Sequence, residues 1–248
     1  MYAQEEIKPY GPEGTKRSQI QKMFDEIAHS YDTLNHSLSL GVDKIWRRSA
    51  IRYLAKNVLS PVREVLDIAT GTGDFALLAW KELQPSHIIG IDISDEMLRI
   101  GREKVAQQKL SAHITLQHED CECMSFENNK FDTIISSFGL RNFQNLDACL
   151  TEMYRVMKQG GTFVVIDLCT PASFPMKQLF GFYKKVVMPL MGRWISHDSF
   201  AYTYLPDSMD AIPQGEKMTP AFVKAGFKNV RFQRQFLGMS ILYTGVKI

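Results

Sequence analysis

The sequence lacks a large excess of charge of either sign. Its 248 residues include 29 Lys and Arg against 27 Asp and Glu, so the formal net charge is only +2. A protein that holds DNA or RNA by its phosphates needs a basic surface, because neutralising phosphate charge supplies most of that affinity. The composition therefore disfavours a nucleic acid substrate.

Long apolar runs are also missing. The most apolar region is interrupted by Lys184, Lys185 and Arg193, and nowhere do the roughly 18 uncharged apolar residues of a membrane-spanning helix follow one another. The four cysteines come without a secretory signal, and the opening MYAQEEIK is acidic, unlike a transit peptide. We expect a cytoplasmic protein, either free or peripheral at the inner face of the cytoplasmic membrane.

The cysteines and histidines do not predict a metal site. His113, His118, Cys121 and Cys123 lie close in the sequence, but their spacing lacks the second C-x-x-C or H-x-x-x-H half of a zinc site. We therefore expect no metal ion. We interpret these cysteines as packing groups or as residues that make contacts through their backbone.

What the sequence does contain is a regular alternation of strand and helix patterns. The predicted strands are VLDIA (65–69), HIIGID (87–92), HITLQ (113–117), FDTIIS (131–136) and TFVVIDL (162–168). Predicted helices occupy residues 74–84, 95–108 and 146–157. Such alternation predicts a parallel sheet covered by helices on both faces.

The two ends of the chain extend this pattern. Residues 16–58 show helical spacing before the first strand, and a predicted helix at 217–225 is followed by two β-rich runs, KNVRFQRQF and SILYTGVKI. A terminal hairpin that pairs antiparallel at the edge of a parallel sheet distinguishes class I S-adenosylmethionine-dependent methyltransferases from other Rossmann-like folds. We predict this α/β fold, with a seven-stranded and mostly parallel sheet.

We expect a single methyltransferase domain, 1–248, in four parts. Residues 1–60 form an N-terminal helical cap and 61–169 the cofactor-binding core. Residues 170–215, rich in proline and aromatic residues, form a substrate-binding insertion after the fifth strand. Residues 216–248 form the C-terminal helix and hairpin.

The loop within VLDIATGTGDFA (65–76) is the most informative stretch for a cofactor. Gly71, Gly73 and Ala76 match the dinucleotide fingerprint G-x-G-x-x-G/A, and Asp92 lies near the distance expected of a ribose-binding acid. A nicotinamide cofactor, and with it an oxidoreductase, is one interpretation.

Two carboxylates beside the loop favour a different cofactor. Asp67 and Asp74 flank it, and Asp74 falls where a pyrophosphate would have to dock. S-adenosylmethionine carries a sulfonium and an ammonium but no phosphate, and it needs glycines such as Gly71 only so that the backbone can approach its amino-acid end. On these grounds we favour S-adenosylmethionine.

Polar residues follow each of the first four predicted strands, where a doubly wound sheet binds its ligand. Asp92 could accept both ribose hydroxyls of an adenosine, since Ser94 already supplies a helix cap. Asp120 and Cys121 could meet an adenine edge, and Ser137 leaves room beside the ligand. An ordinary turn explains any one of these residues, but together they predict one binding site.

Two further stretches carry a family resemblance. YDTLNHSLSLGVDKIW (31–46) and SFGLRNF (137–143) resemble the signatures of the quinone C-methyltransferases of menaquinone and ubiquinone biosynthesis, the UbiE/MenG type. With VLDIATGTGD, GIDISDEML and YRVMKQGGTF added, the resemblance covers nearly the whole chain. It implies cofactor contacts at Thr72, Asp92, Asp120, Cys121 and Ser137.

The sequence departs from this family at a few positions. The family usually has His where this chain has Asp43, Pro where it has Gln159, and Glu-x-Ser where it has 167–169. The first departure weakens any claim that a histidine there is a required base. The other two lie near the fifth strand and look structural.

The resemblance implies methyl transfer from the sulfonium to a ring carbon of a prenylated hydroquinone. A phenolate that forms beside the sulfonium needs cationic or hydrogen-bonding support, and Arg141 is the best-placed candidate. The alternative role for Arg141 is an ion pair with a helix carboxylate. Tyr31 and Asp32 are further catalytic candidates, although Asp32 could equally be a helix cap.

The expected substrate is demethylmenaquinol, with a ubiquinone-pathway benzoquinol as the alternative. A nicotinamide-binding oxidoreductase is an alternative of another class. A non-catalytic S-adenosylmethionine binder would need neither YDTLN nor GLRN, and their presence argues against it.

The aromatic segment QLFGFYKKVVMPLMGRWI should line a channel for the isoprenoid tail. Its cations would meet lipid headgroups, and its apolar residues would face the tail or the bilayer boundary: Lys184, Lys185 and Arg193 are the cations, and Phe180, Phe182, Val186, Met188 and Trp194 the apolar residues. The alternative is a homodimer interface or the core of a lid.

Overall fold

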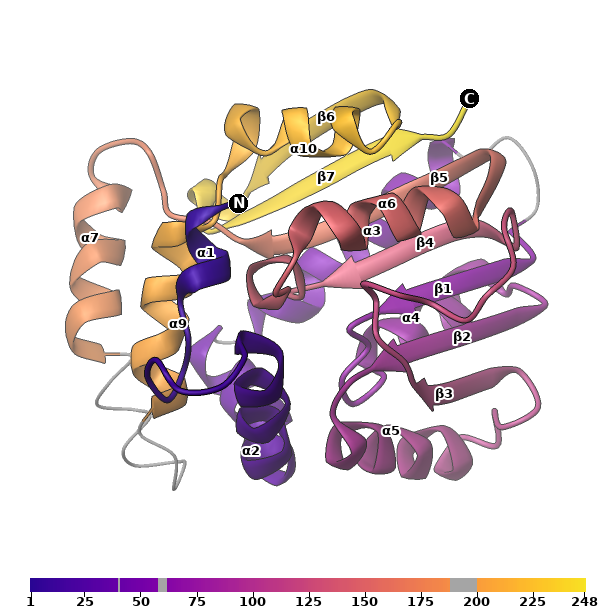
Figure 1. Cartoon of the computed structure of the whole chain (residues 1–248), viewed down its shortest axis with the longest axis horizontal. Helices are drawn as coiled ribbons and strands as arrows, with labels where there is room; N and C mark the ends of the chain where they lie inside the picture. The colour runs from indigo at the N-terminus through magenta and orange to yellow at the C-terminus, as the bar shows by residue number, and fades with distance from the viewer. Residues whose placement is uncertain (40, 58–61, 188–199) are drawn as a thin grey trace.

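The structure, a computed structural model, describes residues 1–39, 41–57, 62–187 and 200–248. Its centre is a seven-stranded sheet with the order β3-β2-β1-β4-β5-β7-β6 (Figure 1). The strands are β1 (Glu64–Ile68), β2 (His87–Asp92), β3 (Ile114–His118), β4 (Phe131–Ser137), β5 (Met157–Leu168), β6 (Lys228–Gln235) and β7 (Ser240–Val246). The first five strands are parallel, and β7 pairs antiparallel with both β5 and β6. The predicted α/β fold with its terminal hairpin is confirmed.

Both faces of the sheet are buried, and this explains the continuous apolar runs of its strands. Leu66, Ile134 and Phe163 point to the face covered by α6 (Leu146–Val156) and α10 (Thr219–Lys224). Their neighbours along the strands, such as Val65, Ile135 and Val164, point to the opposite face. That face is covered by α3 (Val42–Asn57), α4 (Asp74–Leu83) and α5 (Asp95–Gln107). Successive side chains of a strand therefore belong to two separate cores.

The remaining helices gather beyond the carboxyl ends of β4 and β5 (Figure 1). From the N-terminal part come α1 (Ala3–Glu6) and α2 (Lys16–Leu38), and α2 packs through Ile20 and Met23 against Met97 of α5. From the predicted insertion come α7 (Met176–Phe182), the π-helical η2 (Tyr183–Val187) and α9 (Phe200–Ala211). Where it is described, this segment contains no strand, as expected, and it contributes helices to one side of a cavity.

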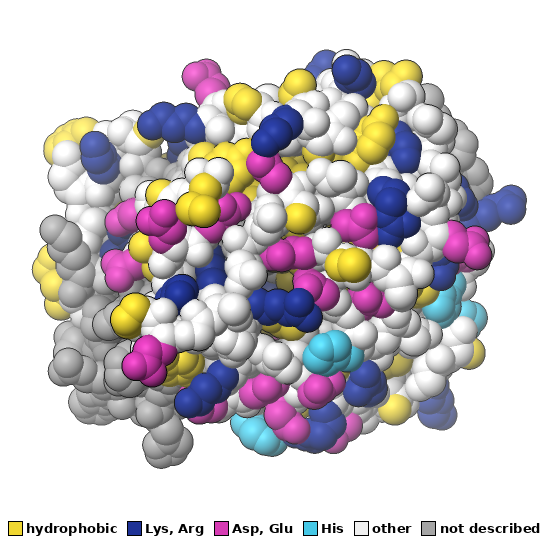
Figure 2. All heavy atoms as spheres, in the orientation of Figure 1, with side chains coloured by type: hydrophobic (Ala, Val, Ile, Leu, Met, Phe, Trp, Pro, Cys, Tyr) yellow, Lys and Arg dark blue, Asp and Glu magenta, His cyan; other side chains and the backbone are white. Residues whose placement is uncertain are grey.

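The surface agrees with the balanced composition. On the face drawn in Figure 2, basic and acidic side chains are interspersed, without a large area of one sign. Among the described residues no helix is both long enough and apolar enough to cross a membrane.

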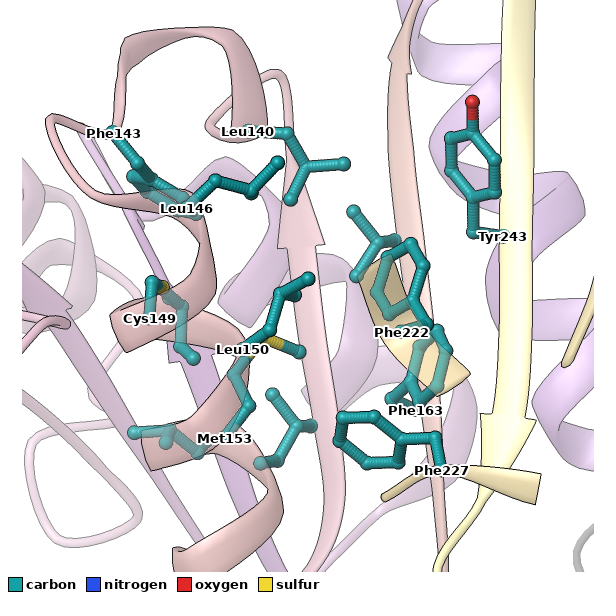
Figure 3. Close-up of a cluster of buried hydrophobic side chains, with 14 of the residues drawn as sticks. Leu140, Phe143, Leu146, Cys149, Leu150, Met153, Phe163, Phe222, Phe227 and Tyr243 are labelled. Atoms are coloured by element: carbon teal, nitrogen blue, oxygen red, sulfur yellow. The ribbon is translucent and has the colours of Figure 1, made fainter. Parts of the chain in front are cut away.

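Aromatic packing dominates the core beneath α6 and α10. Phe163 of β5 is fully buried and stacks on Phe222, with ring centroids 4.7 Å apart, and it meets Phe227 edge-on at 4.6 Å (Figure 3). Tyr243 of β7 lies against the same Phe222 ring at 5.5 Å. This cluster joins the terminal hairpin to the parallel part of the sheet.

Replacing Phe163 by Ala should lower the free energy of unfolding by about 3–5 kcal/mol, because the change leaves a cavity between Phe222 and Phe227. The matched control is Phe232→Ala on β6, where the ring is 36% exposed and the loss should stay below about 1 kcal/mol. Urea unfolding monitored by circular dichroism measures both. Equal losses in the two variants would contradict this account of the core.

Candidate functional site

Two cavities lie side by side at the carboxyl ends of the parallel strands. The larger has a volume of about 340 Å³ and is walled by α2, α3, α7, α9, the segment after β4 and the turn before β7. Most of its lining is apolar, and its polar side chains are few: Tyr31, Asn35, Ser39, Asp43, Arg141, Asn142, Tyr183 and Tyr204.

The smaller cavity has a volume of about 70 Å³ and is lined by the loops that follow the first four strands. The predicted cofactor residues that line it are Gly71, Asp92, Asp120, Cys121 and Ser137. Of the six residues predicted, only Thr72 is not part of this lining.

Four residues form a wall that the two cavities share: Phe24, Tyr31, Phe138 and Asn142. Tyr31 of α2 is fixed by an edge-on contact with Phe24, with ring centroids 5.8 Å apart. Burial raises the pKa of the Tyr31 hydroxyl, so this group stays protonated at neutral pH. Ligands in the two cavities would meet at this wall.

The glycine loop is held against β2 by the carboxylate of Asp92. The backbone N–H of Gly71 donates to Oδ2 at 2.8 Å, and that of Ser94 donates to Oδ1 at 3.0 Å. Gly71 has a φ of +54° and Gly73 one of +79°, backbone conformations that favour glycine. Burial raises the pKa of Asp92, against the lowering effect of these N–H donors. As expected, the helix cap of α5 is Ser94, whose hydroxyl accepts the N–H of Met97.

The two carboxylates that pointed to a cationic ligand do not line the small cavity. Asp67 is fully buried and accepts the Thr70 hydroxyl at 2.6 Å, while its Oδ1 has no hydrogen-bond partner. Burial raises its pKa to about 7. Asp74 is paired with Lys104 at 2.8 Å. The argument from Asp67 and Asp74 was therefore wrong, because one lies in the core and the other already has a cation.

Asp32 is not a helix cap, because it lies well inside α2. Its carboxylate accepts the Thr72 hydroxyl at 2.7 Å and pairs with Lys104 of α5 at 2.5 Å. Lys104 also donates to the Thr72 oxygen at 2.9 Å. Asp32 and Thr72 thus connect the helical cap to the glycine loop, and neither lines a cavity.

Arg141 lies on the 3-10 turn η1 (Leu140–Asn142), lines the larger cavity and is only 7% exposed. Its Nη1 donates to Asp167 and to the Phe138 carbonyl, both at 2.7 Å. The carboxylate partner is therefore on strand β5 and not on a helix. The Nε of Arg141 is buried without a hydrogen-bond partner.

A buried lysine supports the backbone of the same turn. Lys16 at the start of α2 donates to the carbonyls of Gln4 at 2.5 Å and Arg141 at 2.8 Å. Burial lowers the pKa of Lys16 to about 7. Sequence reasoning missed this residue, because nothing nearby in the chain marks it as an internal group.

Other missed residues lie at the ends of the cofactor cavity. Arg17 forms an ion pair with Asp120. Arg47 of α3 donates from Nε to the Ser137 hydroxyl at 3.4 Å and pairs with Asp43 at 2.8 Å. The spacing of Asp43 and Arg47, four residues apart in a predicted helix, was the one available signal.

The sulfur and imidazole groups are separate from one another. A hydrogen bond with the neighbouring Cys149, together with burial, raises the pKa of Cys121 well above its usual value. His118 contacts Asp95 at 3.0 Å, and His113 stacks on Trp80. In the described part of the chain no three His, Cys, Asp or Glu side chains are grouped as they would be around a metal ion.

The insertion meets its expectations only in part. Phe180 is buried and lines the larger cavity, whereas Phe182 is 63% exposed and Val186 38% exposed. Lys184 was expected at lipid headgroups, but it is buried and paired with Asp210, because the helix turns it toward α9. Met188, Arg193 and Trp194 lie outside the described residues, and so does the side chain of Lys185.

A sheet of this strand order, with paired cavities at its carboxyl edge, defines a class I methyltransferase fold. Residues 13–247 match the model of the ubiE/COQ5 methyltransferase family. The chain therefore belongs to the ubiE/COQ5 methyltransferase family, and the resemblance stated from the sequence is confirmed.

Individual relatives agree with this assignment. The chain is 51% identical over 248 residues to a demethylmenaquinone methyltransferase of Bacteroides fragilis, covering 99% of each protein. It is 41% identical over 249 residues to the demethylmenaquinone methyltransferase of Porphyromonas gingivalis, covering 100% of each. In fold it is similar to Haemonchus contortus phosphoethanolamine N-methyltransferase 2, solved with S-adenosyl-L-methionine, at a TM-score of 0.65, 15% identity, and coverage of 94% of this chain and 60% of that one.

Proposed function

We propose that this protein is an S-adenosylmethionine-dependent C-methyltransferase that converts demethylmenaquinol to menaquinol. The observation that carries the proposal is the 51% identity, over the full length, to a relative named demethylmenaquinone methyltransferase. Family membership also favours a methyl donor over the nicotinamide cofactor that the glycine loop left open.

The charges around the small cavity support S-adenosylmethionine. Among the described residues that line it are four carboxylates, from Asp92, Glu119, Asp120 and Glu122, and one cation, Arg17, which is already paired with Asp120. A dinucleotide would bring a pyrophosphate into this acidic surrounding, whereas S-adenosylmethionine brings a sulfonium and an ammonium. The cavity thus favours a cationic ligand, as the sequence predicted, but the carboxylates that line it are not Asp67 and Asp74.

We assign the contacts of the small cavity as follows. Asp92 accepts the ribose hydroxyls with the lone pairs that Gly71 and Ser94 leave free. Asp120 and the backbone of Cys121 take the adenine edge, and Gly71 and Ser137 approach the ligand closely. Thr72 does not contact the ligand directly, since its hydroxyl donates a hydrogen bond to Asp32.

The larger cavity fits a ring with an apolar tail, because most of its walls are hydrophobic or aromatic. When bound, S-adenosylmethionine supplies an electrophilic methyl group. The ring carbon and the methyl group must approach each other closely for the transfer to occur. Tyr31, in the wall that the two cavities share, keeps water away from the place where they meet. Arg141, which lines this cavity, stabilises the negative charge that develops on the ring oxygen through the positive charge of its guanidinium. Asp32 supports the site indirectly, by holding α2 on the glycine loop.

The substrate should be the reduced quinol, and the oxidised quinone should be inert. A sulfonium methyl is an electrophile, so the accepting carbon must be electron-rich, and a quinone ring is electron-poor. Labelled S-adenosylmethionine is incubated with the protein and a short-tailed demethylmenaquinone, with and without a chemical reductant, and extracted naphthoquinone is counted. A benzoquinone of the ubiquinone pathway serves as the second acceptor. Equal product without reductant would refute a carbon nucleophile, and no product in either naphthoquinone arm would refute the proposed function.

Asp92→Ala should weaken S-adenosylmethionine binding by more than about tenfold, because the ribose loses a charged acceptor and the Gly71 loop loses its anchor. Isothermal titration calorimetry measures the affinity. Glu103→Gln, an exposed change on the far side of α5, is the control. An unchanged affinity in Asp92→Ala, or tight NADH binding by the native protein, would remove the cofactor assignment.

We further propose that the protein contacts the bilayer through the exposed apolar residues around the larger cavity. Leu179 lines this cavity yet is 59% exposed, and Phe182 and Val186 continue the same helical row at spacings of three and four residues. Leu237, 69% exposed, lies in the turn before β7, whose Met239 also lines the cavity. A membrane-embedded tail could enter here without crossing water. The alternative, that this surface is a homodimer interface, is one outcome of the test below.

Leu179→Ser combined with Phe182→Ser should reduce co-sedimentation with vesicles of phosphatidylethanolamine and phosphatidylglycerol at least severalfold, because the pair removes exposed apolar area. Val223→Ser, a 49% exposed position on α10, is the control and should leave binding unchanged. If neither variant changes vesicle binding but the double variant alters the mass in solution, the surface is an interface between copies.

A further inference from the structure

The wall of the larger cavity contains a carboxylate to which no role has been given above. Asp43 lies in the first turn of α3 and is 2% exposed. Among the described residues that line this cavity it is the only carboxylate, and no histidine is among them. A buried carboxylate in an apolar cavity needs compensation and is therefore a candidate for function.

Ser39 and Arg47 are among the neighbours that hold Asp43 in place. Ser39 donates its hydroxyl to Oδ1 at 2.7 Å, and Arg47 donates from Nη1 to Oδ2 at 2.8 Å. A carboxylate can accept several hydrogen bonds at once, and Asp43 lines the cavity in which a quinol would bind. The guanidinium of Arg47 lies over the Phe138 ring at 5.3 Å, which fixes it at the wall between the cavities.

The charged groups around this pair come from several elements. On α3, Arg47 is its direct counter-ion, and on α4 Asp74 lies 3.7 Å from the same guanidinium. Asp74 is in turn compensated by Lys104 of α5, which also pairs with Asp32 of α2. Elsewhere in the cavity wall, Arg141 of η1 is engaged with Asp167, and Tyr31 of α2 is uncharged. An opposite charge in hydrogen-bond contact favours the charged carboxylate.

The proposed reaction needs a proton acceptor in this cavity. A neutral hydroquinone carbon is a weak nucleophile, and loss of the neighbouring hydroxyl proton makes it electron-rich. Arg141 cannot accept that proton, because a guanidinium stays protonated in proteins. Tyr31 keeps its own proton, since burial raises the pKa of its hydroxyl.

We infer that Asp43 is the catalytic residue that accepts the hydroxyl proton of the quinol, with Ser39 and Arg47 as its positioning residues. This inference rests on the proposed function. As the quinol O–H bond breaks, an O–H bond forms on the Asp43 carboxylate, and the oxygen electron pair moves into the ring. The ring carbon then bonds to the methyl group while the sulfur–methyl bond breaks. The proton on that carbon leaves to water, the ring regains aromaticity, and the oxygen takes its proton back from Asp43, so that one proton is released per turnover.

The test is the pH dependence of kcat/KM for the reduced acceptor, measured anaerobically from pH 6 to 9. The wild-type rate should vary little, because Asp43 and not a base from solution takes the proton. Asp43→Asn should be at least about 100-fold slower at pH 7 and gain about tenfold per pH unit, as free quinolate in solution replaces the missing base. Asp43→Glu should keep the wild-type shape of the profile. Asp207→Asn, an exposed change on α9, should match the wild type.

A second variant keeps the inference open to refutation if the amide disturbs the fold. Asp43→Ala should be rescued by added acetate, which supplies a small carboxylate, whereas the wild type should not respond. For every variant, calorimetry should show unchanged affinity for S-adenosylmethionine, since Asp43 does not line the small cavity.

The outcomes separate the two proposals. Suppose that the wild type turns over, that the pH profile of Asp43→Asn runs parallel to the wild-type profile, and that acetate does not rescue Asp43→Ala. These results would give Asp43 a structural role and overturn this inference alone. A wild-type protein that leaves demethylmenaquinol unmethylated would overturn the proposed function, and this inference with it.

Discussion

The site depends on one carboxylate that joins two loops. Asp92 accepts the backbone N–H groups of Gly71 and Ser94, so the loops after β1 and β2 cannot move independently. Thr72, next to Gly71, then holds Asp32 and through it the helix α2, which brings Tyr31 to the wall between the cavities. A change at Asp92 would therefore reach the substrate cavity through two hydrogen bonds, Gly71 to Asp92 and Thr72 to Asp32. The position of the methyl acceptor in the larger cavity therefore depends on the position of the glycine loop.

The central strands of the sheet could be predicted from the sequence because they are buried on both faces. Runs such as HIIGID and TFVVIDL have no polar alternation, so β2 was found at its observed bounds. The end of β5 was also found, but this strand begins at Met157 and not at the predicted Thr162. The strand-end rule then located Asp92, Asp120 and Ser137 beside one cavity, since it depends only on topology. The pattern of neighbouring residues was sufficient to predict a strand wherever the central side chains of that strand are buried.

The pairing of charges could not be predicted in the same way. Asp74 looked available for a ligand, but Lys104, 30 positions later, neutralises it, and Arg141 found its partner in Asp167 and not on a helix. Lys184 was likewise predicted to be a surface cation, but it is buried and paired with Asp210. Long side chains choose partners across the tertiary structure, and no spacing rule in one sequence encodes that choice. The balanced net charge also concealed a local excess of carboxylates around the small cavity.

The terminal hairpin closes one side of the sheet with a strand that resists association. Outer strand β6 is mostly exposed and carries Lys228, Arg231 and Arg234, whereas its inner neighbour β7 is almost entirely buried. An approaching strand from another molecule would have to bring its backbone against this row of cations, and two copies of β6 would repel each other. The same hairpin that extends the core therefore ends in an edge strand whose cations disfavour the addition of a strand from another molecule.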